Sequence, residues 1–290
     1  NRRMVDHAPA DQYPRTENRK QMPPDSRDFT AEARISPEGN CQVWSGHLAD
    51  GTRAFLKQYP ETRSWLQEKQ ALKQWLPRLS PDLAHLPQIL AEDSTEKTLL
   101  LSSVPGESVE QIWSRLEQHD DVMKSAGAFL RALHDLPFQD TDEMPLSDSL
   151  PMRLESWIKN HDNSLSEAEI CTARKRVGNG TQFEGDTRVP CHNDFQPRNW
   201  LWNGSQIGVI DFEHAHANHP AFDWIRMETG IWLEQPRLRD CFIEGYGMAP
   251  AWSAGSARDA VGAIHAIGCI VWGTRHEDES LVSEGRRILR

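Results

Sequence analysis

Asp194 lies two residues after His192 and five residues before Asn199. A short hydrophobic run then ends in Asp211, within VIDFE. Phosphoryl transfer needs a carboxylate that accepts the proton of the attacking hydroxyl, and oxygen ligands that hold Mg²⁺ on the nucleotide phosphates. The order and spacing match a kinase catalytic loop, which predicts Asp194 as the base and Asn199 and Asp211 as Mg²⁺ ligands. His192 would brace the loop by hydrogen bonding.

The first part of the chain offers a matching phosphate contact. A kinase places a strand lysine on the α- and β-phosphates and holds it with a helical glutamate. Lys57 lies in the run AFLKQY, and Glu68 follows in a helix-forming segment. This is the predicted nucleotide-binding pair; an exposed strand lysine and a solvated helix face are the alternatives, and Glu61 competes with Glu68. Asp223 follows Pro-Ala-Phe at an expected helix start, where it would cap the helix or brace the catalytic loop.

The sequence patterns predict a small β-rich lobe over residues 34–101. Two of its strands flank the turn Ala49-Asp50-Gly51, which is a hairpin signal. The run SSVPG then breaks the pattern and predicts a hinge over residues 102–107, where Ser102 and Val104 would contact the nucleotide. The predicted strands are 42–48, 53–59, 88–91 and 97–101, with one helix at 62–76.

After the hinge the chain becomes largely helical, which predicts a larger lobe over residues 108–290. Short strands near 199–203 and 207–211 carry the candidate catalytic residues. The fold class is therefore α+β, with a ligand cleft expected between two lobes. Residues 1–33 are polar and predict an N-terminal extension that is partly ordered at best. The predicted helices are 108–117, 121–136, 151–159, 165–177, 220–232, 237–245 and 256–272.

The chain is acidic, with 32 Lys and Arg against 43 Asp and Glu and a formal net charge of −11. Such a surface repels nucleic acid and anionic membranes, so neither is expected as the main partner. Ten acids stand against three bases within residues 101–150. This favours a cationic small-molecule substrate, and a solvated helix surface is the alternative. Five cysteines without a CxxC pair, no bilayer-length apolar stretch and no signal-peptide pattern predict a reduced, cytoplasmic protein.

Several motifs stand in order along the chain: Lys57, LLLSSVPGE (99–107), ALHD (132–135), CHND with Asn199, and VIDFE (209–213). Together they resemble the aminoglycoside phosphotransferase and choline kinase superfamily, over roughly residues 36–275. The resemblance implies a protein-kinase-like bilobal fold that transfers the γ-phosphate of ATP to a hydroxyl of a small molecule. It also implies the roles given above for Lys57, Asp194, Asn199 and Asp211.

The sequence departs from a protein kinase in three ways. Glu213 stands where a protein kinase has the glycine of Asp-Phe-Gly, and no GxGxxG precedes Lys57, where Ser36–Gly46 takes its place. No Ala-Pro-Glu follows Asp211. The His-Asn-Asp triplet resembles the choline kinase branch, whereas the run Pro-Arg-Asn-Trp resembles bacterial antibiotic phosphotransferases.

The sequence thus predicts an ATP- and Mg²⁺-dependent small-molecule kinase, either a monomer or a homodimer. An aminoglycoside-like antibiotic is the favoured acceptor, and an amino alcohol such as choline or ethanolamine is the alternative. A non-catalytic binding protein of the same fold is a further alternative. Trp224, Trp232 and Trp272 are either core residues or the walls of a cage for a cationic substrate.

Overall fold

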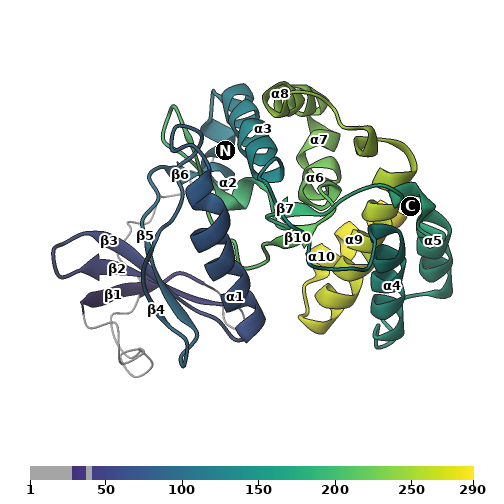
Figure 1. The fold of residues 1–290 in the computed structure, drawn as a ribbon, viewed down its shortest axis with the longest axis horizontal. Coiled ribbons are helices and arrows are strands. Elements are labelled where there is room, and N and C mark those ends of the chain that lie inside the picture. The colour runs from purple at the N-terminus through teal and green to yellow at the C-terminus, as the bar shows by residue number, and fades with distance from the viewer. Residues whose placement is uncertain (1–27, 37–40) are drawn as a thin grey trace, which may run out of the picture.

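The computed structural model describes residues 28–36 and 41–290. These residues form two lobes, a smaller one built on a β-sheet and a larger one that is mostly helical (Figure 1). The predicted α+β architecture with a small first lobe and a larger helical second lobe is confirmed. No helix of the described ranges is long and apolar enough to cross a membrane.

The smaller lobe is an antiparallel five-stranded sheet in the order β1-β2-β3-β5-β4, so that β3 is its central strand. Side chains alternate across a strand, and on β3 this puts Ala54 and Leu56 in a small core with Trp44. Lys57 therefore projects from the opposite face of β3, toward the helix that follows. The strands are β1 (Phe29–Arg34), β2 (Gln42–Leu48), β3 (Arg53–Gln58), β4 (Ile89–Asp93) and β5 (Thr98–Ser102).

One helix covers the second face of this sheet. Helix α1 (Thr62–Gln70) continues into a π-helical turn and a 3₁₀ turn that end at Arg78. Trp65, Glu68, Leu72 and Trp75 are buried at helical spacing, which defines the face that packs on the sheet. The indole Nε1 of Trp65 donates a 3.2 Å hydrogen bond to the carbonyl of Thr98 on β5. This contact fixes α1 against the sheet and sets the position of Glu68.

The connection between the lobes packs closely on a hairpin of the larger lobe. Residues 103–106 link β5 to β6 (Glu107–Ser108), and that hairpin is formed by β8 (Trp200–Trp202) and β9 (Ile207–Val209). Gly106 has a φ of 122°, and a Cβ there would lie 2.8 to 2.9 Å from backbone atoms of Trp202. Only glycine fits this close approach. The hinge is therefore tied to the two strands that lie between Asn199 and Asp211.

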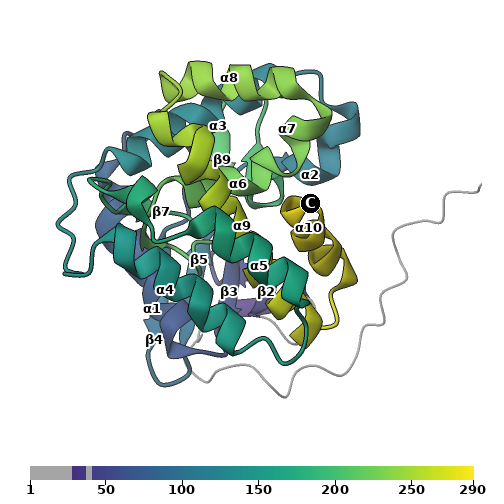
Figure 2. The ribbon, with the colours of Figure 1, turned by 90° about the vertical axis from the view of Figure 1, so that its right-hand side faces the viewer.

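Two hydrophobic cores fill the larger lobe, and the first of them continues into the smaller lobe under α1. In the first, α3 packs along α8; in the second, α9 lies among α4, α5, α6 and α10. Figure 2 shows α4 and α5 in front of α9, with α10 beside it. The helices are α2 (Val109–Ile112), α3 (His119–His134), α4 (Leu146–Lys159), α5 (Glu167–Val177), α6 (Ala221–Glu228), α7 (Ile231–Glu234), α8 (Pro236–Tyr246), α9 (Gly255–Arg275) and α10 (Glu279–Leu289), and the remaining strands are β7 (Val189–Cys191) and β10 (His216–Asn218).

The structure corrects one predicted boundary and adds one helix that the sequence did not predict. Residues 29–33 were assigned to the N-terminal extension, but they belong to β1, because Phe29 packs in the small core and the strand pairs with β2. Residues 1–27 of that extension, and residues 37–40 of the loop before Lys57, lie outside the described residues. Helix α10 was not predicted. Its N-cap, the side chain of Asp278, accepts from the backbone of Leu281.

We expect Gly106→Ala to lower the free energy of unfolding by ~2–4 kcal/mol, because the added methyl group meets the Trp202 backbone and the φ angle is unfavourable. Gly51→Ala is the matched control. Its φ is 84° and no atom lies within 4 Å of the added Cβ, so only the backbone cost of ~1–2 kcal/mol applies. Urea unfolding of both variants measures the difference. An equal fall in the free energy of unfolding for both variants would show that the close approach to Trp202 does not contribute to stability.

Candidate active site

A buried ion pair joins the sheet of the smaller lobe to its helix. Lys57 Nζ lies 2.6 Å from Glu68 Oε2, and the exposed fractions of the two residues are 6% and 0%. The Tyr59 hydroxyl donates to the same carboxylate oxygen at 2.7 Å, and the backbone N–H of Phe212 donates to Glu68 Oε1 at 3.3 Å. The sequence-predicted pair of Lys57 and Glu68 is thus brought together, and Glu61 takes no part in it.

Asp211 joins this pair from the larger lobe. Its Oδ1 lies 2.7 Å from Lys57 Nζ, and its backbone adopts a φ of 69°, which turns the chain sharply after β9. Burial raises the pKa of Asp211, but attraction to Lys57 and the hydrogen bond with Lys57 bring it down to about 2. Burial lowers the pKa of Lys57, but Asp211 and Glu68 raise it well above its ordinary value. Lys57 and Asp211 are therefore both charged at neutral pH.

Asp194 is surrounded by donors. Its Oδ1 accepts from Gln196 at 2.6 Å and lies 2.9 Å from Arg226 Nε. Its Oδ2 accepts from Arg198 and Asn199, both at 2.8 Å. Burial raises the pKa of Asp194, but the guanidinium groups of Arg226 and Arg198 lower it by more, so its net shift is downward. The carboxylate is ionised at neutral pH and can accept a proton.

Asn199 and nearby carboxylates could hold a divalent cation. The amide nitrogen of Asn199 donates both to the backbone carbonyl and to the carboxylate of Asp194. The side-chain oxygen of Asn199, Oδ1, accepts no hydrogen bond among the described residues, so it can bind a ligand. Carboxylate oxygens of Glu68, Asp211 and Glu213 also lie within 4.8 Å of one another. Oxygen donors of this kind suit Mg²⁺, so the residues present fit the predicted metal.

The buried carboxylate of Asp223 holds the loop that carries Asp194. It accepts from the backbone N–H groups of His192 and Asn193, and it contacts His134 Nε2 at 3.0 Å. Asn193 has a φ of 63°, a left-handed conformation that asparagine tolerates better than most residues. Asp223 is fully buried at the start of α6, so it braces the loop from behind and is not open to a substrate.

His192 links the two halves of the site. Its Nε2 lies 3.0 Å from the carbonyl oxygen of Ile210, and its ring packs against Phe212. These contacts fix the residues on both sides of Asp211. His192 is fully buried, as expected for the bracing role that the sequence suggested.

The two predicted nucleotide contacts of the hinge, Ser102 and Val104, differ in their hydrogen bonding. The N–H of Ser102 donates to the carbonyl of Gln88, and its hydroxyl accepts from the N–H of Gln88, both at 2.9 Å. The N–H of Val104 donates no hydrogen bond within the described ranges. Val104 is buried, and its side chain lies over Gly208 of β9. The role of these two residues in nucleotide binding therefore stays a prediction.

A pocket of about 450 Å³ opens next to Asp194. Gln196 and Arg226, which both contact Asp194, form part of its wall. Its charged lining consists of Arg226 from α6 together with Glu284 and Arg287 from α10. The full lining is Gln196, Pro197, Arg226, Met227, Gly230, Ile231, Ser280, Ser283, Glu284 and Arg287.

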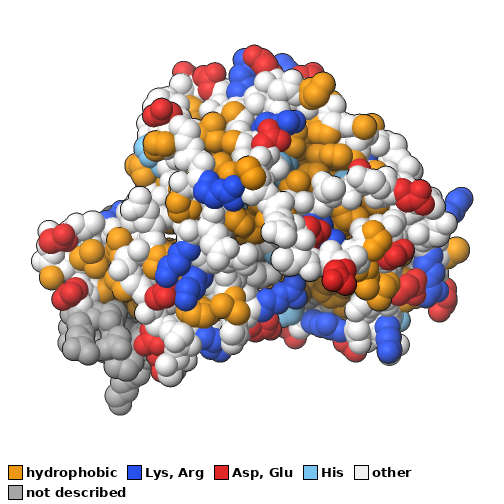
Figure 3. All heavy atoms as spheres, in the orientation of Figure 1, with side chains coloured by type: hydrophobic (Ala, Val, Ile, Leu, Met, Phe, Trp, Pro, Cys, Tyr) orange, Lys and Arg blue, Asp and Glu red, His pale blue; other side chains and the backbone are white. Residues whose placement is uncertain are grey.

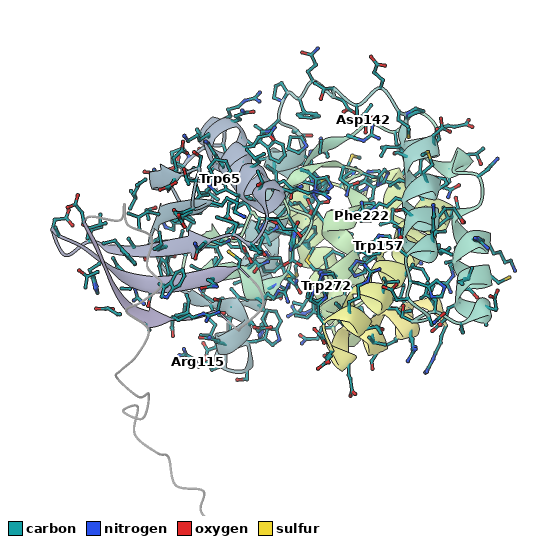
Figure 4. All side chains as sticks on the ribbon, turned by 90° about the horizontal axis from the view of Figure 1, so that it is seen from below. Trp65, Arg115, Asp142, Trp157, Phe222 and Trp272 are labelled. Atoms are coloured by element: carbon teal, nitrogen blue, oxygen red, sulfur yellow. The ribbon has the colours of Figure 1, made fainter. Side chains whose placement is uncertain are left out.

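The acidic segment 101–150 does not contribute to this pocket. Half of its ten acids form ion pairs with arginines: Glu107, Asp120, Asp135, Asp140 and Asp142. In Figure 4 the labelled Arg115 and Asp142 lie at opposite edges of the molecule. Figure 3 shows acidic and basic side chains interspersed over the visible face, with no single acidic patch. The segment's charge is thus spread over the surface, and half of its acids are compensated by arginines.

The tryptophans do not form a cage at this site. Trp224 and Trp232 are buried core residues: Trp224 packs edge-on against Trp232 and Phe242, and Trp232 packs on Phe242 at a tilt. Trp272 is 37% exposed and stacks on His276, and it does not line the pocket. The core interpretation holds for the first two residues.

Sequence reasoning missed several residues that the structure brings to the site. Arg226 and Arg287 come from helices far along the chain, and no local motif marks them. Glu213 was noted only as a departure from Asp-Phe-Gly, although its place two residues after Asp211 was a usable signal. Arg198 stood in the Pro-Arg-Asn-Trp run without an assigned role.

Comparison with known proteins gives a family and a fold. The profile of the phosphotransferase enzyme family matches residues 38–258. An uncharacterized kinase-like protein of Caenorhabditis elegans, D1044.1, is 25% identical over 161 residues, which are 48% of this chain and 40% of that protein. The chain thus spans less than half of the length of that curated relative.

Solved structures share the fold at low identity. The gentamicin–APH(2'')-IIa complex has a TM-score of 0.65 at 16% identity, and the match covers 88% of this chain and 89% of that one. The GDP complex of aminoglycoside 2'-phosphotransferase-IIIa has a TM-score of 0.66 at 15% identity, covering 91% and 93%. A thermostable mutant of the aminoglycoside phosphotransferase APH(4)-Ia, with ADP and hygromycin B, has a TM-score of 0.67 at 14% identity, covering 90% and 94%. By its two-lobed fold and by the profile that spans most of its length, the chain belongs to the phosphotransferase enzyme family.

Proposed function

We propose that this protein is a small-molecule kinase that transfers the γ-phosphate of ATP to an acceptor hydroxyl. The observation that carries the proposal is the cluster of Lys57, Glu68 and Asp211, which spans both lobes. His192 links this cluster to the loop of Asp194, because its ring contacts both the carbonyl of Ile210 and the backbone N–H of Asp194. A non-catalytic binding protein would not need an ionised carboxylate beside an open pocket. The family and the nucleotide complexes of its structural neighbours support the same conclusion.

Nucleotide binding is assigned to the cleft under the β lobe. The carbonyl of Ser102 and the N–H of Val104 would pair with the adenine, and Lys57 would lie on the α- and β-phosphates. Mg²⁺ would be held by Asp211 and Asn199 and would neutralise charge on the phosphates. Because Glu68 is fully buried and bonded to Lys57, its assigned role is to hold the ammonium group in place.

Asp194 is assigned as the base. As the acceptor oxygen bonds to the γ-phosphorus, the hydroxyl proton passes to an Asp194 oxygen, and the bond from that phosphorus to the β,γ-bridging oxygen breaks to release ADP. Both Asp194 oxygens already have donors, so the acceptor hydroxyl must displace one of them. Two of the four donors, Gln196 and Asn199, are neutral amides and can be displaced at a lower electrostatic cost than the charged Arg198 and Arg226. Of these two, Gln196 is the candidate, because Asn199 is also tied to the backbone carbonyl of Asp194.

The chemical class of the acceptor does not follow from the kinase assignment. The sequence favours an aminoglycoside-like or amino-alcohol acceptor, and the neighbours APH(2'')-IIa and APH(4)-Ia are solved with gentamicin and hygromycin B. Their identity of 14 to 16% supports the fold but not the acceptor. The acids on which the cationic prediction rested do not line the pocket, so the acceptor must be argued from the pocket itself.

We expect Asp194→Asn to lower kcat by ~10²-fold or more, because the amide keeps the shape of the side chain but cannot accept the proton. Affinity for MgATP, measured by calorimetry, should stay within a few-fold of the parent protein and serves as the control for folding. Release of ADP in a coupled assay with the accepted substrate gives kcat. A variant that keeps more than about a tenth of the parent rate would remove Asp194 as the base.

We expect Asp211→Asn to weaken binding of ATP by ~10-fold or more in the presence of Mg²⁺, because an anionic ligand to a hard cation is lost. In EDTA the parent and the variant should bind ATP with similar affinity. Asp240→Asn is the matched control, since Asp240 is exposed on α8. Calorimetric titration of ATP under both conditions is the measurement, and an unchanged Mg²⁺ dependence would take Asp211 out of the metal site.

A further inference from the structure

The pocket beside Asp194 is placed to hold the acceptor. Gln196 and Arg226 line it and also contact Asp194 Oδ1, so a molecule in the pocket has one end next to the proposed base. A volume of about 450 Å³ is in the range of small-molecule sites. Met227 and Ile231 supply an apolar wall, and α10 supplies the polar wall opposite.

One face of α10 is directed at the pocket. Ser280, Ser283, Glu284 and Arg287 are spaced by three, one and three residues, which puts them on one side of a helix. Arg286 lies outside this face and bonds to Glu169 of α5 at 3.1 Å. Two adjacent arginines of the same helix thus have different surroundings.

Arg287 lines the pocket without forming an ion pair among the described residues. It is exposed, and within the described part of the chain no carboxylate lies within ion-pair distance of it. Arg226, by contrast, is held by Asp194. A guanidinium group offers several donors in a planar fork that suits carboxylate and phosphate oxygens.

Glu284, the one acidic residue that lines the pocket, already has positively polarised neighbours. Glu284 lies 3.5 Å from His265 Nε2. Burial raises the pKa of Glu284, but the contact with His265 and the charges of Arg226 and Arg287 lower it by more. A cationic ligand beside Glu284 would therefore meet two guanidinium groups, without an aromatic lining to offset their repulsion.

We propose that the acceptor carries an anionic oxygen group, a carboxylate or a phosphate, which binds Arg287 while its hydroxyl reaches Asp194. This rests on the proposed function and names its substrate class. It replaces the expectation of a cationic acceptor with one that follows from the charges that line the pocket. Ser280 and Ser283 add hydroxyl groups to the same anion contact.

Four hydroxyl compounds of similar size distinguish the possibilities: glycerate carries a carboxylate, glycerol 3-phosphate a phosphate, ethanolamine a cation, and glycerol no charge. Binding of each to the full chain is measured by calorimetry with Mg²⁺ and ADP present, and turnover by release of ADP from MgATP. We expect at least one anionic compound to bind ~10-fold or more tightly than glycerol and ethanolamine. The better of the two anions identifies the group.

The matched variants are Arg287→Gln and Arg286→Gln. Each removes one positive charge from an exposed position of α10, but only Arg287 lines the pocket. Arg287→Gln should weaken binding of the anionic compound by ~10-fold or more, because a charge-assisted hydrogen bond is lost. Arg286→Gln should leave it unchanged, and neither variant should alter the affinity for MgATP.

Titration of MgATP alone separates this inference from the proposed function. If the parent protein does not bind MgATP, the kinase assignment fails. If it binds MgATP but prefers ethanolamine or glycerol, or if the two arginine variants behave alike, the anionic acceptor is wrong and the kinase assignment stands.

Discussion

The site depends on the buried contact between Lys57 and Glu68. Removing either charge from water is costly, and the cost is recovered only when the partner and its other hydrogen bonds are in place. Here Tyr59, the backbone of Phe212 and Asp211 complete the shell around the pair. Since these groups come from β3, α1 and the segment after β9, the same contact sets the relative position of the sheet, its helix and the larger lobe. A helix displaced by one turn would leave an uncompensated charge in the interior.

A second buried carboxylate does the same for the catalytic loop. Asp223 takes two backbone N–H groups from a segment that has no regular structure, and it contacts His134 of α3. The loop is therefore ordered by side-chain contacts rather than by a backbone ladder. The bridge from His85 to the β9 strand adds a further link, because His85 exchanges backbone hydrogen bonds with Ile207 and Val209. The His85 bridge and the ion pair of Lys57 with Asp211 thus join the two lobes at places other than the hinge.

Local spacing predicted the lobes and the candidate residues around Asp194 and Lys57, because kinase chemistry fixes these residue types within short segments. It could not predict Arg226 or Arg287, since their place in the pocket depends on how α6 and α10 pack, and neither has a local signal. Helix α10 was missed although Asp278 offered a cap. The cationic acceptor was inferred from net charge over fifty residues, and such a sum ignores the arginines from other segments that neutralise it. The roles assigned to the individual site residues remain predictions.

The four hydrogen-bond donors around Asp194 bear on whether ATP is transferred to an acceptor or hydrolysed by water. If Asp194 acts as the base, a water molecule that enters the cleft finds both carboxylate oxygens occupied, and one weak contact is not enough to displace a donor held at 2.6 to 2.9 Å. An acceptor anchored elsewhere in the pocket can bring the binding free energy that this exchange needs. The hydrogen bonds to Asp194 would then keep hydrolysis of ATP slow when no acceptor is bound.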